Sequence, residues 1–284
     1  MAPTAAMEIY FDGLLTEPRL DHPEGIAVHP NDGSVWCGGE RGQIFRIAEG
    51  KIEQVASTDG FCLGIAFSHT GDLYICDLAH AAVLRMDGQT GELARFADGA
   101  GELRFVSPNF VLVDAAGRVY VSDNGVPNQP GPGVFRFDPD GSGELWHPGP
   151  FNFANGMALS PDGRTLFVVE SWARRVVAVP IAGDGTSGTA SAVVELPEMI
   201  PDGLAFDVHG RLYVACYEPS QILTVDPATG DWAVLARDPD AHMLCHPTNI
   251  AFREDRLLAA NLGRWHVTSI DVGVAGVPVP PPAS

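Results

Sequence analysis

The chain has 284 residues, of which 45% are hydrophobic, and it carries a formal net charge of −19. This charge disfavours nucleic acid and anionic membranes, so we expect neither as a partner. No apolar run approaches the roughly 18 residues needed to cross a bilayer. We expect no signal peptide, because the first residues have neither a basic segment nor an apolar core. The five cysteines are expected to be reduced, buried thiols, so we predict a cytoplasmic protein.

One pattern occurs six times along the chain: an apolar strand, a tight turn rich in Asp and Gly, and a second apolar strand. The clearest copy covers residues 201–215. The six copies begin near positions 25, 64, 110, 156, 203 and 249, which are 39, 46, 46, 47 and 46 residues apart. Periods of about 40–50 residues with four short strands each predict a β-propeller rather than a solenoid of helix pairs.

Further strands follow within each repeat, as the alternating segments 43–47 and 52–55 of the first repeat show. The third repeat contains a Gly- and Pro-rich insertion at 124–133, which we expect to be a loop. The sixth repeat offers only three strands before the Pro-rich tail, residues 277–284, for which we expect no function.

The missing strand of the sixth repeat has a donor at the other end of the chain. Residues 8–11, Glu-Ile-Tyr-Phe, form a short apolar strand with no partner nearby in sequence. Pairing this strand with the sixth repeat would close the ring and remove an exposed sheet edge. We therefore predict an all-β fold: a single domain over residues 1–284 that is a six-bladed β-propeller, its last blade closed by an N-terminal strand.

The residues directly before the first, innermost strand of each repeat are candidates for a functional site. In a propeller these strands line the central channel and enter from one face, so equivalent residues form a ring. Four of the six carry an amide or carboxylate oxygen and none is basic. Two acids without a counter-charge are costly to bury unless a cation joins them, and oxygen ligands suit hard divalent ions. The six residues are Glu24, Leu63, Asn109, Asn155, Asp202 and Thr248.

Three motifs stand at or next to the ring: Glu24-Gly25, Asn155-Gly156 with Ser160-Pro161-Asp162-Gly163, and Pro201-Asp202-Gly203 with the strand that follows. Through these motifs the sequence resembles the gluconolactonase family that includes senescence marker protein, or regucalcin. The resemblance implies a six-bladed propeller with lactone hydrolase activity. It also implies that Glu24, Asn155 and Asp202 bind one divalent metal ion, with Asn109 beside the ion or bound to it. We expect Ca²⁺, with Mn²⁺, Mg²⁺, Zn²⁺ and Fe²⁺ as alternatives.

The chain departs from the sugar-lactone pattern of that family at two positions. Ser107 and Phe110 stand where such members carry an Arg that would hold sugar hydroxyls and an Asp. Aromatic residues instead gather in the loops before the third and fourth repeats. We therefore expect a less polar lactone or ester as substrate. The predicted substrate contacts are Ser107, Phe110, Phe153, His246 and Thr248.

The second strand of each repeat returns to the same face, so its end also surrounds the ring. Asp123 and Glu170 stand at two of these ends, next to predicted metal-ligand repeats. We predict hydrolysis by a metal-activated water, with Asp202, Asp123 or Glu170 accepting the proton. Cys216, at the end of another second strand, is the one competing nucleophile.

Two other functions stay open from the sequence. One is a metal-binding propeller that acts in interactions without catalysis. The other is an enzyme similar to the strictosidine synthases, which share the propeller but need a catalytic acid and an amine pocket. We expect a small-molecule substrate and a monomer or small homo-oligomer.

Overall fold

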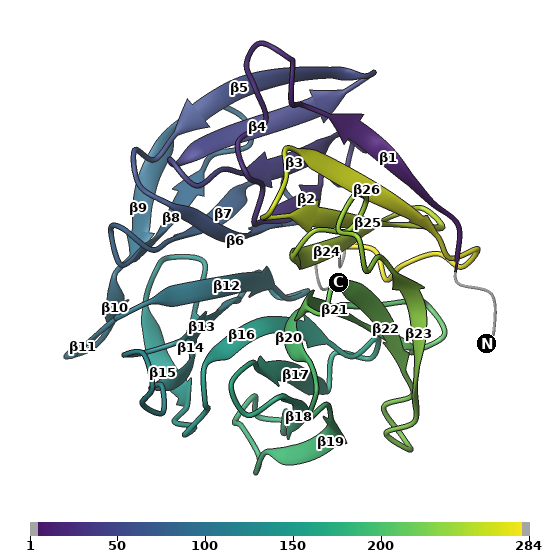
Figure 1. Cartoon of the computed structure of the whole chain (residues 1–284). Helices are drawn as coiled ribbons and strands as arrows, with labels where there is room; N and C mark the ends of the chain where they lie inside the picture. The colour runs from purple at the N-terminus through teal and green to yellow at the C-terminus, as the bar shows by residue number, and fades with distance from the viewer. Residues whose placement is uncertain (1–4, 280–284) are drawn as a thin grey trace.

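The computed structural model describes residues 5–279, which fold into β-strands and contain no helix, and so no helix that could span a membrane. Six antiparallel sheets of four strands each surround a central axis (Figure 1). The prediction of a six-bladed β-propeller is confirmed. The first three blades contain β2 (Ile26–Val28), β3 (Val35–Gly38), β4 (Gln43–Ala48) and β5 (Lys51–Ser57); β6 (Cys62–Phe67), β7 (Leu73–Asp77), β8 (Ala82–Met86) and β9 (Leu93–Ala97); and β12 (Pro108–Val113), β13 (Val119–Asp123), β14 (Gly133–Phe137) and β15 (Gly143–His147).

The last three blades follow the same order from the inside outward, and the sixth takes its outer strand from the start of the chain. They contain β16 (Ala154–Leu159), β17 (Thr165–Glu170), β18 (Arg175–Pro180) and β19 (Ser191–Glu195); β20 (Ile200–Phe206), β21 (Leu212–Glu218), β22 (Gln221–Val225) and β23 (Trp232–Arg237); and β24 (Pro247–Arg253), β25 (Arg256–Asn261), β26 (His266–Asp271) and β1 (Met7–Asp12).

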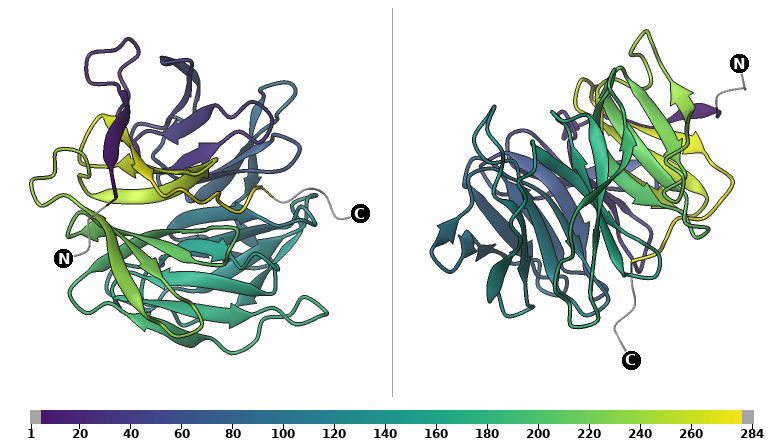
Figure 2. Two further views of the ribbon diagram at one scale, coloured as in Figure 1. Left: turned by 90° about the vertical axis from the view of Figure 1, so that its right-hand side faces the viewer. Right: turned by 90° about the horizontal axis from the view of Figure 1, so that it is seen from below.

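The first and the last strand of the described chain pair in the sixth blade. Strand β1 pairs antiparallel with β26, from Met7 opposite Ile270 to Asp12 opposite His266. The predicted closure by residues 8–11 is therefore confirmed, because β1 covers the edge of β26 and completes the four strands of the sixth blade. Figure 2 shows the same six sheets from the side and from below.

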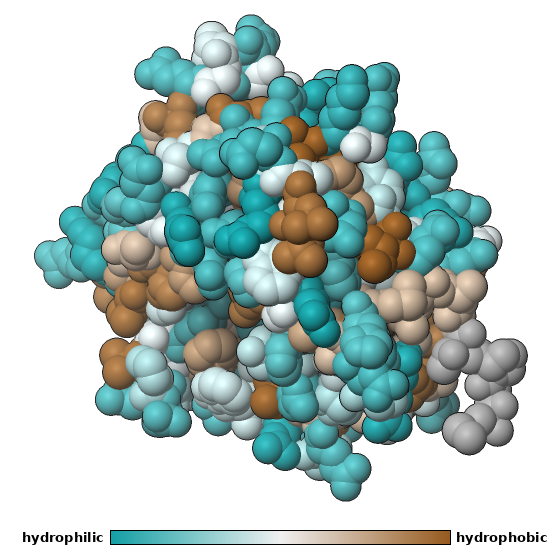
Figure 3. Space-filling model, turned by 45° about the horizontal axis from the view of Figure 1, so that its top comes forward, coloured by the Kyte–Doolittle hydropathy of each residue, from teal (hydrophilic) through white to brown (hydrophobic). Residues whose placement is uncertain are grey.

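The hydrophobic core is divided into six clusters, one between each pair of neighbouring blades. Aromatic pairs add to several of them, such as Phe105 against Phe135 with ring centroids 4.9 Å apart. All five cysteines are buried and free, as expected. On the face shown in Figure 3, hydrophobic residues form small separate patches within a hydrophilic surface.

Two features were not predicted from the sequence. A two-stranded hairpin, β10 (Gly99–Ala100) and β11 (Leu103–Arg104), stands before the third blade. The start of the predicted tail is tied to the fifth blade, because the amide of Val277 donates to the carbonyl of Phe206 at 2.9 Å and its side chain joins the core. The rest of the tail from residue 280 lies outside the described residues.

Candidate functional site

The six inner strands β2, β6, β12, β16, β20 and β24 contact one another in a closed cycle around the channel. Their crowding explains the glycine that follows the ring residue in most blades. A Cβ on Gly203 would lie 2.6 Å from the carbonyl oxygen of Thr248 in the next inner strand. A side chain at this position would push two inner strands apart. Because glycine has none, the two strands, and with them their ring residues, lie close together.

The four oxygen-bearing ring residues are buried at the start of their strands. Glu24 and Asn155 are each 4% exposed, Asn109 is 5% exposed and Asp202 is 7% exposed. They come from the first, third, fourth and fifth blades. The structure thus brings the four residues predicted from the sequence to the same end of the channel.

Within the described residues, 5–279, several oxygens of this ring have no hydrogen-bond partner. These are Oδ1 of Asn109, Oδ1 of Asn155 and Oδ1 of Asp202, all buried. The amide of Asn155 is oriented, because its Nδ2 donates to Oγ of Ser171 at 3.1 Å and that hydroxyl donates to the carbonyl of Pro201 at 2.8 Å. Buried polar atoms without partners are rare in proteins and call for an explanation at each site. An oxygen donor set of this kind fits a hard divalent cation.

The two carboxylates of the ring carry charge that nothing nearby balances. Burial, and then the neighbouring Asp202, raise the pKa of Glu24 well above its usual range. Burial likewise raises the pKa of Asp202. No cationic side chain is among the groups that shift either pKa. A divalent cation would offset this buried charge, so the electrostatics and the donor atoms agree.

Asn249 joins this site, although the sequence analysis did not select it. It occupies the position that is glycine in most blades and is 1% exposed. Its Nδ2 donates to Oε2 of Glu24 and to the backbone carbonyl of Glu24, both at 3.0 Å, while its Oδ1 has no partner. The signal in the sequence was an asparagine at a position that is glycine in four of the other five repeats.

Thr248 was predicted to contact the substrate, but its side chain is buried and bonded within the protein. The side chain is 1% exposed and its hydroxyl donates to the backbone carbonyl of Glu24 at 2.8 Å. Because the hydroxyl is buried and engaged, it is not available to a substrate. It holds the start of β2 against β24 instead.

Asp123 and Glu170 also differ from the roles predicted for them. Asp123 is fully buried and accepts backbone amides from Val106 at 2.8 Å, Ser107 at 2.9 Å and Gly125 at 2.8 Å. Glu170, 1% exposed, accepts the amide of Asn152 at 2.8 Å and Nε of Arg175 at 2.6 Å. Both oxygens of each carboxylate are occupied. These contacts give the two residues a structural role, holding the loops that lead into the third and fourth blades, and do not support a role as proton acceptors.

The residues two positions before the ring form a second, outer layer. All six are half-buried, and three of them are non-glycine residues with left-handed backbone: His22 with φ 42°, Phe153 with φ 65° and His246 with φ 50°. Such strain of non-glycine residues clusters at functional sites. Each of the three packs on an aromatic ring: Trp265, Trp172 and Tyr217 respectively, with centroids 4.9, 4.8 and 4.5 Å apart.

The predicted substrate contacts other than Thr248 stay accessible. Ser107, Phe110, Phe153 and His246 are half-buried. Phe110 follows Asn109 on the inner strand β12 and packs partly on the core between the third and fourth blades. Trp172, beside Phe153, is 46% exposed. The third and fourth blades therefore give the channel mouth an apolar side.

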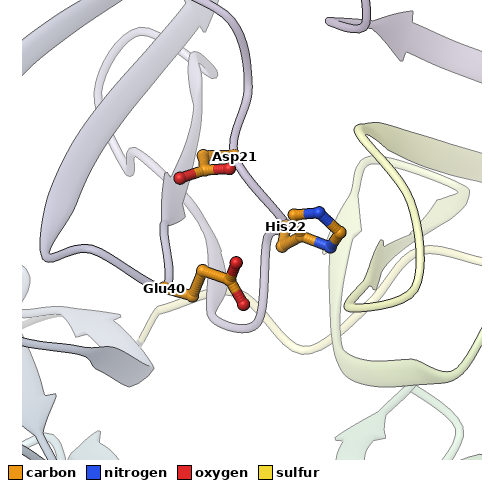
Figure 4. A group of neighbouring side chains, drawn as sticks. All are labelled: Asp21, His22 and Glu40. Atoms are coloured by element: carbon orange, nitrogen blue, oxygen red, sulfur yellow. The ribbon is translucent and has the colours of Figure 1, made fainter.

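A separate group of metal-binding residue types lies at the first blade. One ligand atom from each of Asp21, His22 and Glu40 lies within 4.8 Å of the others (Figure 4). The carboxylate of Asp21 already accepts Nε2 of Gln43 at 3.0 Å and lies 3.6 Å from Nε of Arg41. Asp21 therefore has a cationic partner within the protein, whereas no cationic side chain is among the groups that shift the pKa of Glu24 or Asp202.

Cys216 is a poor nucleophile in this environment. The thiol is fully buried, and burial, followed by the charge of Asp202, raises its pKa far above the usual range. The reactive form of a cysteine is the thiolate, so this side chain stays unreactive at neutral pH.

The sequence model of the family described as SMP-30/Gluconolactonase/LRE-like region matches residues 22–258, which span the whole oxygen ring. The chain belongs to this family. Curated relatives include a strictosidine synthase-like protein of Arabidopsis thaliana, 26% identical over 72% of this chain and 58% of that protein. Regucalcin of Gallus gallus is 28% identical over 64% of this chain and 63% of its own length. The matches thus span less than two thirds of either relative.

Solved structures show the same fold at low identity. A gluconolactonase from Xanthomonas campestris has a TM-score of 0.79 at 20% identity, covering 94% of this chain and 90% of its own. A calcium-binding protein, regucalcin, from Agrobacterium tumefaciens has a TM-score of 0.72 at 19% identity, covering 93% and 95%. The recognition of a gluconolactonase-type propeller from the sequence is therefore confirmed.

Proposed function

We propose that this protein is a divalent-metal-dependent hydrolase of a lactone or related ester. The observation that carries the proposal is the central ring: buried, unpartnered oxygens of Asn109, Asn155 and Asp202 next to the uncompensated carboxylates of Glu24 and Asp202. Glu24, Asn109, Asn155 and Asp202 would hold the ion. The calcium-binding regucalcin among the similar structures makes Ca²⁺ the first candidate. When bound, the ion would polarise the substrate carbonyl and acidify a water molecule.

The protein's own residues would bind and orient the substrate. Phe110, Phe153 and Trp172 offer apolar contacts on one side of the channel mouth. Ser107 stands where a sugar-lactone enzyme of this family would carry an Arg. We therefore propose a substrate less polar than an aldonolactone, held with its apolar part toward the third and fourth blades and its carbonyl toward the ring.

A metal-reconstitution assay tests this function. Purified protein is analysed for bound metal, stripped with EDTA, and assayed on lactones, carboxylic esters and phosphotriesters with Ca²⁺, Mn²⁺, Zn²⁺ and Fe²⁺ added back. We expect one metal per chain, loss of hydrolysis on stripping, recovery with the correct ion, and a preference for apolar lactones. Hydrolysis that survives complete removal of metal would contradict the proposal.

A second candidate function is a synthase of the strictosidine synthase type. The similarity to the plant strictosidine synthase-like protein favours it. Condensation of an amine with an aldehyde, tested in the same assay, separates the two candidates. A stoichiometric metal with neither hydrolysis nor condensation would instead support a metal-binding propeller without catalysis.

A further inference from the structure

The proposed hydrolysis needs a group that accepts a proton from the attacking water, and the contacts of Asp123 and Glu170 leave neither free. Asp202 is assigned to the metal in the proposed function. We infer that His246 is the residue that moves this proton. The inference rests on the proposed function and adds a catalytic residue to its site.

The backbone of His246 is held in place from two sides. Its amide donates to Oγ of Ser220 at 3.1 Å, and its carbonyl accepts the amide of Leu262 at 3.2 Å. The residue has φ 50° and is followed by Pro247, although a residue before proline favours extended backbone. This strained conformation is held by the surrounding contacts, and it places the imidazole in the outer layer of the channel mouth.

The imidazole is held in one orientation by contacts to Nδ1 and to its ring face. Nδ1 lies 3.2 Å from the carbonyl of Tyr217 and 3.2 Å from Oε2 of Glu218. Both partners only accept hydrogen bonds, so Nδ1 carries the proton and Nε2 of the neutral ring has a free lone pair. The contacts of the imidazole within residues 5–279 are made by Nδ1, and the side chain is 37% exposed. The ring stacks on Tyr217 at 4.5 Å, which limits its rotation.

The imidazole also lies on the correct side of the channel. It belongs to the loop before β24, whose Asn249 donates to the carboxylate of Glu24. The imidazole stacks on Tyr217. Burial, and then the nearby carboxylate of Asp202, raise the pKa of Tyr217, so this tyrosine lies close to the ring residue Asp202. The apolar residues of the mouth belong to the third and fourth blades. The mouth is therefore divided into an apolar side for the substrate body and a side with a proton acceptor.

The proton balance of the step is complete. Nε2 of His246 accepts a proton from water as the water oxygen bonds to the carbonyl carbon. When the tetrahedral intermediate collapses, the ring C–O bond breaks and the imidazolium returns the proton to the departing alkoxide oxygen. One lactone and one water give one hydroxy acid, which loses its carboxyl proton to solvent.

The test compares His246→Gln with His29→Gln in the metal-loaded protein. His29 is a matched control, because its Nδ1 lies 3.1 Å from Asp32 and its ring packs on Phe67 at 4.9 Å, but it follows the opposite end of an inner strand. We expect H246Q to lose about 10²–10⁴-fold in kcat with little change in KM. We expect it to keep wild-type metal content and thermal stability, and H29Q to keep full activity.

Two further measurements separate catalysis from a structural role. The pH–rate profile of H246Q should differ in shape from that of the wild type; the titratable groups next to the imidazole are Glu218 and Tyr217 on β21 and Cys245 beside it in the sequence. Imidazole in the buffer should restore part of the activity of His246→Ala.

If H246Q hydrolyses at the wild-type rate with the wild-type profile, or loses its metal, the role of His246 is overturned while the proposed function stands. If wild type hydrolyses no compound of the panel, the proposed function fails and this inference fails with it.

Discussion

At the scale of single residues, the central ring depends on two carboxylates with nothing to balance them. We expect Glu24→Gln and Asp202→Asn each to lower metal affinity by more than tenfold, because either change removes one of two formal charges from a hard-cation site. Leu63→Ala changes an equivalent ring position that carries no oxygen and should bind metal as the wild type does. Calorimetric titration of stripped protein with Ca²⁺ measures this. Wild-type affinity in both acid variants would contradict the assignment.

Cys216 supplies a second test at the residue scale. Its thiol is buried and its pKa is raised, so a covalent mechanism through this sulfur is not expected. Cys216→Ala removes one buried sulfur and should cost roughly 1–2 kcal/mol of stability, while kcat stays within about twofold of wild type. Steady-state kinetics at a temperature where both proteins are folded checks this. A loss of turnover with the metal still bound would show that the thiol takes part.

At the scale of elements, the end of the second strand anchors the loop that leads into its blade in the second, third, fourth and sixth blades. Asp123 accepts three backbone amides there, and Asn261 and Asp77 accept those of Cys245 and Phe61 in their own blades. We expect Asp123→Ala to lower the free energy of unfolding by about 3 kcal/mol, since three backbone amides lose their acceptor and the buried carboxylate leaves a small cavity. Asp140→Ala removes an acceptor from an exposed turn and should cost less than about 1 kcal/mol. Urea denaturation gives both values; equal losses would refute the anchoring role.

Strand β1 is the second element whose role can be isolated. Deleting residues 1–12 removes the outer strand of the sixth blade and uncovers the edge of β26. We expect the truncated chain to aggregate or to unfold at a markedly lower temperature, because an open edge invites pairing with other chains. Size-exclusion chromatography and thermal denaturation would show this. A monomer with wild-type stability would mean that closure by β1 is dispensable.

At the scale of the whole molecule, proton binding in the ring couples stability to pH and metal. Burial raises the pKa of Asp202 to about 7, while a carboxyl in the unfolded chain titrates near pH 4. Between about pH 4 and pH 7 the metal-free folded state holds a proton that the unfolded state has released, so stability falls as pH rises through this window. Bound metal competes with that proton, so the rise in Tm on adding Ca²⁺ should be larger at pH 7 than at pH 5. Scanning calorimetry with and without EDTA tests this, and Asp202→Asn should reduce both effects. A calcium effect independent of pH would contradict the coupling.

The sequence by itself determined the repeat, the number of blades and the closure. These follow from local rules: apolar strands alternate with Asp/Gly turns at a fixed spacing, and the unpaired strand at residues 8–11 has one place to pair. Equivalent positions in a closed ring must meet at the axis. The repeat therefore also predicted that four residues at one such position lie together: Glu24, Asn109, Asn155 and Asp202.

Only the tertiary structure decided what the neighbouring polar residues do, because hydrogen bonding and burial depend on contacts between distant segments. Asp123 and Glu170 hold loops through both oxygens of their carboxylates, and Thr248 holds the backbone of Glu24. Asn249 reaches a carboxylate 225 positions away in the sequence. The orientation of His246 likewise depends on Tyr217 and Glu218 in another blade. A repeat pattern fixes which residues share a position, but the partners of each side chain are set by how adjacent blades pack.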